Sequence, residues 1–99
     1  MLKSIVLTIS LLSSTFAYAY LPPKEYDHPY RGKLSVVYLD RLPMLLKCRS
    51  IACAHVYSPN RCKIYLPKFK TRDPLWVIRR HEIGHCNGWF GHEGMRPYK

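Results

Sequence analysis

Two histidines separated by three residues are the feature of this sequence best suited to chemistry. Residues 81–85 read His-Glu-Ile-Gly-His, an H-E-x-x-H pattern. Side chains four positions apart on a helix share one face, so His81 and His85 can both reach a single ion. Zinc accepts neutral imidazole nitrogen, and Glu82 is placed to take a proton from a metal-activated water. The pattern therefore predicts Zn²⁺ as cofactor and Glu82 as general base. A structural zinc site and a surface helix with two unrelated histidines are the alternatives.

Residues 81–92 resemble the extended zinc motif of the metzincin metallopeptidases, which belong to the zincins. In that family a glycine after H-E-x-x-H turns the chain, and a third metal ligand follows. The resemblance implies that Gly88 makes the turn and that His92 is the third ligand. His92 lies one residue further from the glycine than the family spacing. Glu93 is therefore an alternative third ligand, because carboxylate oxygen also binds zinc.

A strand expected just before the motif extends the resemblance. Residues 62–66 have strand composition, and Pro67 after them favours an edge position, because proline cannot donate to a ladder. In zincins an edge strand before the metal helix binds the substrate. The resemblance implies that Lys63, Ile64 and Tyr65 bind an extended peptide through main-chain hydrogen bonds. An ordinary edge strand is the alternative.

The two ends of the helix that would carry the motif are marked in the sequence. Asp73 followed by Pro74 is typical of a helix start, with a capping carboxylate and a proline at the first helical position. Gly88 is typical of a helix stop in the left-handed conformation. We therefore expect a helix over residues 74–87, which includes the whole H-E-x-x-H pattern.

Three segments predict strands. Residues 34–39 are β-branched and aromatic, and residues 51–57 and 62–66 flank a turn sequence, Ser-Pro-Asn-Arg, so that they predict a hairpin. Residues 44–46 are apolar but too short to assign after Pro43. These elements predict a small α+β domain in which an antiparallel sheet packs on one dominant zinc-binding helix, with disulfides stabilising the fold.

The four cysteines are an even number, as expected for a small exported protein. Their spacings do not form the paired C-x-x-C pattern of a zinc ribbon. Four cysteines allow three pairings, and we favour Cys48–Cys53 as a local loop with Cys62–Cys86 as the longer cross-link.

The first residues have the pattern of a secretory signal peptide. A single lysine precedes a short apolar stretch that ends in Ala-Tyr-Ala, so residues 1–19 are predicted to be removed. An uncleaved anchor is the alternative, although such an anchor needs about 20 apolar residues. Residues 20–33, rich in proline, are expected as an extended arm, and residues 34–99 as a minimal zincin-like domain. The expected location is secreted or periplasmic, in a bacterium.

The formal net charge of +10 at pH 7 is spread along the chain, and no nucleic-acid-binding motif is present. We therefore expect no nucleic acid partner, and no stable membrane insertion once the signal peptide is cleaved. The function predicted is an exported zinc-dependent peptidase acting on a peptide or protein of the cell envelope or exterior. The alternatives are a non-catalytic basic secreted module held by structural zinc or disulfides, and a small basic envelope-active factor without metal.

Overall fold

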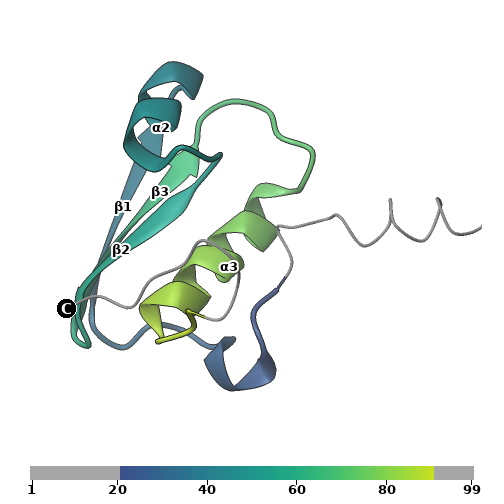
Figure 1. The fold of residues 1–99 in the computed structure, drawn as a ribbon. Helices are drawn as coiled ribbons and strands as arrows, with labels where there is room; N and C mark the ends of the chain where they lie inside the picture. The colour runs from purple at the N-terminus through teal and green to yellow at the C-terminus, as the bar shows by residue number, and fades with distance from the viewer. Residues whose placement is uncertain (1–20, 91–99) are drawn as a thin grey trace, which may run out of the picture.

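The computed structural model describes residues 21–90 (Figure 1). The predicted signal peptide and the two candidate third ligands, His92 and Glu93, lie outside this range. The elements, in chain order, are η1 (Lys24–Tyr26), β1 (Lys33–Leu39), α2 (Arg41–Cys48), β2 (Cys53–Ser58), β3 (Arg61–Pro67) and α3 (Leu75–Cys86). The α+β class is confirmed. Between residues 21 and 90, no helix combines the length and the apolar character needed to cross a membrane.

The three strands form a mixed sheet in the order β1-β3-β2. β3 pairs antiparallel with β2, as the predicted hairpin requires, and parallel with β1, with Ile64 opposite both Ala54 and Val36. The expectation of a purely antiparallel sheet is therefore wrong. The expectation that β3 lies at an edge is also wrong. The connection through α2 carries the chain across the sheet, so that β2 lies two positions from β1 and β3 fills the space between them.

Pro67 is compatible with a central strand because it is the last residue of β3. It lies opposite Leu39, and the pairing continues one residue later, where the backbone N–H of Lys68 donates to the carbonyl of Leu39 at 2.9 Å. At the other end of the sheet, the N–H of Lys33 donates to the carbonyl of Asn60 at 2.8 Å. Gly32 permits this approach, because a Cβ there would lie 2.5 Å from the Asn60 oxygen.

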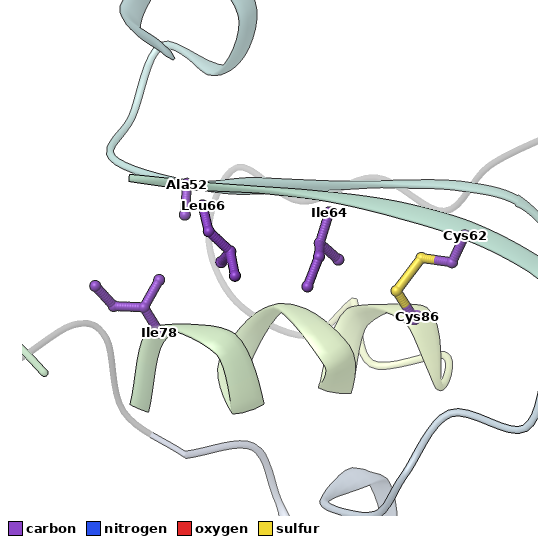
Figure 2. Close-up of a cluster of buried hydrophobic side chains, with 6 residues drawn as sticks. All are labelled: Ala52, Cys62, Ile64, Leu66, Ile78 and Cys86. Carbon is purple, nitrogen blue, oxygen red and sulfur yellow. A yellow bond between two sulfur atoms is a disulfide. The ribbon is translucent and has the colours of Figure 1, made fainter. Parts of the chain in front are cut away.

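The core lies between α3 and one face of the sheet (Figure 2). Strand alternation directs Cys62, Ile64 and Leu66 of β3 toward the helix, and all three are at most 1% exposed. Ile78 and Cys86 of α3 meet them, and a disulfide joins Cys62 to Cys86 with the Cα atoms 5.7 Å apart. This pairing was predicted, and it attaches the motif-bearing helix to the central strand.

Helix α2 lies on the opposite side of the sheet from α3 (Figure 2) and was not predicted. Pro43, which the sequence analysis treated as an interruption, occupies the first turn, where a helix has no internal partner for its N–H groups. Met44 is fully buried, and Arg49 ends the helix with a left-handed φ of 58°. The predicted disulfide Cys48–Cys53 is confirmed and joins the end of α2 to the start of β2.

Helix α3 forms where it was predicted, and its C-terminal glycine, Gly88, has the expected positive φ of 107°. Its N-terminal cap differs from the expectation. Pro74 is the capping residue, and no side chain bonds to the first turn. Oδ2 of Asp73 is buried and, within residues 21–90, has no hydrogen-bond partner.

Candidate functional site

The H-E-x-x-H pattern lies on α3, and its three polar side chains converge. His81, Glu82 and His85 each offer one ligand atom, and these atoms lie within 4.8 Å of one another. All three residues are buried, with exposed fractions of 7%, 6% and 2%. Helical spacing explains the convergence of the two histidines, and Glu82 reaches the same region from the adjacent position. This cluster could hold a metal ion, so the predicted metal-binding group is supported in that general form.

The carboxylate of Glu82 provides a test of whether a cation fits the cluster. Its Oε1 is buried, and no residue in the range 21–90 provides a hydrogen bond to it. Burial raises the pKa of Glu82 to about 8, because the charged form loses its hydration. A buried acceptor without a partner destabilises a fold unless something satisfies it. Two imidazoles and one carboxylate form a donor set suited to zinc or a similar divalent ion.

Trp89 packs directly on both histidines. Its ring stacks on that of His85 with the centroids 4.8 Å apart and meets the ring of His81 edge-on at 5.0 Å. Nδ1 of His85 lies 2.6 Å from the backbone carbonyl oxygen of Trp89. Because a carbonyl only accepts, Nδ1 carries the proton, and Nε2 is the nitrogen with the lone pair. A metal-binding histidine needs its tautomer and ring orientation fixed in this way.

The turn after α3 brings Trp89 back onto the helix. The N–H of Trp89 donates to the carbonyl of Gly84 at 3.1 Å, and the N–H of Gly88 donates to that of His85 at 3.0 Å. This pair of bonds is the usual C-terminal cap around a left-handed glycine. From the sequence, Trp89 after the turn glycine has two interpretations, covering the site or simple packing, and the structure places its ring on both histidines. An aromatic residue directly after a predicted left-handed stop was the available signal.

The N-terminal arm covers the side of α3 near the cluster. Pro22 packs so tightly on Gly84 that a Cβ at residue 84 would lie 2.6 Å from it. Nδ2 of Asn87 donates to the backbone carbonyls of Tyr26 and His28, at 2.9 and 2.7 Å. An ion pair between Arg80 and Asp27 adds a further attachment. The arm therefore holds the helix from the side opposite the sheet.

The predicted substrate-binding residues have different surroundings from those expected. Ile64 is fully buried in the core, and Tyr65 is 6% exposed. Since β3 is the central strand, its backbone is paired on both sides, and Lys63, Ile64 and Tyr65 do not offer an open edge to a peptide. The sheet edge nearest α3 belongs to β2, and within residues 21–90 no strand pairs with its outer side.

Comparison of the chain with protein-family models, with curated proteins and with solved structures finds no match. The two disulfides are consistent with an oxidising, extracellular type of compartment.

Proposed function

We propose that the chain is an exported zinc-dependent peptidase that hydrolyses peptide bonds, with His81 and His85 as metal ligands and Glu82 as general base. The observation that carries the proposal is the convergence of three buried ligand groups on one helix, one of them a carboxylate oxygen without a partner in the described chain. His92 is the proposed third ligand, with Glu93 as the alternative, as the resemblance to metzincins implies.

Zinc, when bound, would supply the Lewis acidity that activates water and polarises the scissile carbonyl. Glu82 would then accept a proton from the attacking water and deliver it to the leaving amine as the C–N bond breaks. Its environment suits both steps. Burial favours the protonated form of Glu82, whereas a neighbouring cation favours the carboxylate, so the side chain can alternate between the two.

The hydrogen bond from His85 to the carbonyl of Trp89 and the stacked indole give the second ligand a fixed orientation. Ligand groups held this way lose little freedom when a metal binds. Removal of the Trp89 ring is therefore expected to loosen the site without removing a ligand.

The substrate proposed is an extended peptide or protein segment of the cell envelope or exterior. The outer edge of β2, which packs next to α3, would bind it by main-chain hydrogen bonds. This assigns to β2 the role that the sequence analysis gave to β3. The side chains of Ala54 and Val56 are turned toward the core, so the bound peptide would be recognised mainly through its backbone.

The test compares the wild type with two variants, each of which replaces one carboxylate by an amide. The wild type, Glu82→Gln and a control, Glu25→Gln at an exposed position, are loaded with zinc and incubated with a mixture of unstructured peptides. We expect Glu82→Gln to retain zinc and to lose about a hundredfold or more in hydrolysis, whereas Glu25→Gln cleaves like the wild type. Undiminished cleavage by Glu82→Gln would refute the assignment of the base.

The burial of the cluster favours a second candidate, a non-catalytic basic module with a structural metal. Structural zinc sites are closed by four protein ligands, whereas catalytic sites keep one position open to water. If Glu82 is itself a ligand, Glu82→Gln will lower zinc affinity and the melting temperature together, and no peptide in the mixture will be cleaved. The same variant therefore separates the two candidates.

A further inference from the structure

The surface of α2 that faces away from the sheet is apolar. Leu42, Leu45 and Leu46 are 64%, 56% and 75% exposed. Spacings of three and four residues place them on one stripe of the helix, opposite the buried Met44. We name these three residues the α2 leucine face. Contiguous exposed apolar surface on a small soluble protein marks an interaction site more often than single exposed residues do.

The fold holds this face in place without using the leucines. A disulfide fixes Cys48 to Cys53 at the end of the helix. The N–H of Arg49, in its left-handed cap, donates to the carbonyl of Leu45 at 2.9 Å, and the N–H of Met44 donates to that of Asp40, also at 2.9 Å. The helix is therefore anchored by Met44 on its buried side and by the disulfide at its C-terminal end, and the leucines are exposed to solvent on this support.

Cationic residues accompany the leucine face on the same helix. Arg41 and Lys47 lie in α2 and Arg49 at its C-terminal cap, and the helix contains no acidic residue. The Arg41 guanidinium lies 4.5 Å from the centroid of the Phe69 ring, and the Lys47 ammonium lies 5.5 Å from that of Tyr65. These contacts hold both charges beside the helix.

The positive region continues onto the sheet next to α2. Burial lowers the pKa of the His55 imidazole, and the charges of Lys47 and Lys63 lower it further. The acid nearest to α2 in the sequence, Asp40, lies 3.9 Å from the ammonium of Lys68. The surroundings of the leucine face are therefore cationic, with the neighbouring carboxylate already offset by a lysine.

We propose that the α2 leucine face docks this protein on bilayer surfaces rich in anionic phospholipid. The leucines would enter the boundary between headgroups and acyl chains, while Arg41, Lys47 and Arg49 contact the lipid phosphates. A helix of eight residues is too short to span a bilayer, so the attachment is peripheral and reversible. This proposal does not rest on the peptidase function. If both hold, the peptidase works at the surface of an envelope membrane.

Charge complementarity favours a lipid surface over the other possible occupants. A second copy of the chain would bring two cationic rims together around the paired leucines, and like charges oppose that contact. A nucleic acid would satisfy the cations but offers no apolar phase for three leucines. An anionic bilayer provides phosphates for the cations and, directly beneath them, an apolar phase for the leucines.

Vesicle flotation tests the proposal with the oxidised, exported protein. The vesicles are either pure phosphatidylcholine or a mixture with phosphatidylglycerol, and four proteins are compared. These are the wild type, the triple variant Leu42→Ser/Leu45→Ser/Leu46→Ser, the variant Arg41→Gln/Lys47→Gln/Arg49→Gln, and the control Leu75→Ser. Leu75 is 43% exposed but lies on α3, across the sheet.

We expect the wild type and Leu75→Ser to float with the anionic vesicles and to bind pure phosphatidylcholine far more weakly. The serine variant should lose about tenfold or more in binding, and the glutamine variant roughly fivefold for each cation removed. Melting temperatures and thiol assays confirm that each variant is folded and oxidised. The glutamine variant keeps the test decisive if the serine variant fails to fold.

Two results would overturn the proposal. One is a wild type that fails to float with anionic vesicles. The other is equal binding by the wild type and both multiple variants. A wild type that self-associates, ignores vesicles and becomes monomeric when the leucines are changed would show instead that this face joins two copies.

Discussion

Helices α2 and α3 lie on opposite sides of the sheet and depart in opposite ways from the usual arrangement of polar and apolar side chains. α3 buries two histidines and a carboxylate, whereas α2 exposes three leucines. The exposed leucines do not stabilise the fold, and burial of the Glu82 carboxylate, whose Oε1 has no hydrogen-bond partner within residues 21–90, has a desolvation cost. Each helix also has a buried side that does stabilise the fold, through Ile78 in α3 and Met44 in α2. The buried polar cluster of α3 and the exposed leucines of α2 are therefore the surfaces on which we expect binding.

The largest expected effect concerns the proposed metal ligands on α3. His85→Ala removes one imidazole and also the hydrogen bond to the carbonyl of Trp89, so zinc affinity should fall by more than about a hundredfold. Competition with a fluorescent zinc chelator measures it. His55→Ala, which changes a histidine on the other side of the sheet, serves as the control and should bind zinc like the wild type. Equal zinc affinities for the wild type and both variants would refute the proposal that His85 of α3 binds the metal.

A leucine packed against α3 and a leucine exposed on α2 should contribute differently to the free energy of unfolding. Leu66 is fully buried between β3 and α3, and Leu66→Ala should lower the free energy of unfolding by about 2–5 kcal/mol. Leu46 is 75% exposed, and Leu46→Ala should change it by no more than about 0.5 kcal/mol. Urea titrations measure both. A large loss for Leu46→Ala would mean that the leucine face stabilises the fold and is not a docking surface.

Each disulfide joins one helix to the sheet, so removing the disulfides one at a time should separate the two proposed binding functions. Cys62→Ala/Cys86→Ala opens a cross-link with a sequence separation of 24 and should cost about 3 kcal/mol, with weaker zinc binding. Cys48→Ala/Cys53→Ala opens one with a separation of 5 and should cost about 2 kcal/mol, with weaker vesicle binding and zinc binding retained. Urea titration, zinc competition and vesicle flotation provide the three measurements. If both pairs weaken both activities equally, the two helices are not independent.

The stability of the metal-free protein is also expected to depend on pH. Burial raises the pKa of Glu82 to about 8, so the folded state binds more protons than the unfolded state from about pH 5 to pH 8. The free energy of unfolding should therefore fall as pH rises through this window, by at most about 1.4 kcal/mol per pH unit. Urea titrations in chelator at several pH values measure the slope. Glu82→Gln should flatten it and Glu25→Gln should not, and a wild type as flat as Glu82→Gln would contradict the account.

Much of α3 and its surroundings was predictable because the signals are local. The glycine stop at residue 88, the turn that joins β2 to β3 and the histidine spacing each depend on a few neighbouring residues. The disulfide from Cys62 to Cys86 was the favoured one of three possible pairings, and the structure confirms it. The helix N-terminus was less well predicted, because Asp73 provides no capping bond and Pro74 takes the capping position.

The missed features depend on contacts distant in the sequence. Pro43 indicates a break, and only its place in the first turn makes it compatible with α2. Nothing in the composition of β3 shows that β1 pairs with its second side, so a central strand was taken for an edge. The arm that covers α3 could not be foreseen either, since Pro22 and Gly84 meet across more than half of the chain. Trp89 acquires its role only through the backbone turn that carries it back onto the histidines.

The most direct test of the account is the zinc content of the wild-type protein, purified in its oxidised form and never exposed to a chelator. Elemental analysis should find about one zinc per chain, and the same preparation of a His81→Ala/His85→Ala variant should contain none. A wild type that carries no metal and takes up none when zinc is added would contradict the assignment of His81, Glu82 and His85 as a metal centre.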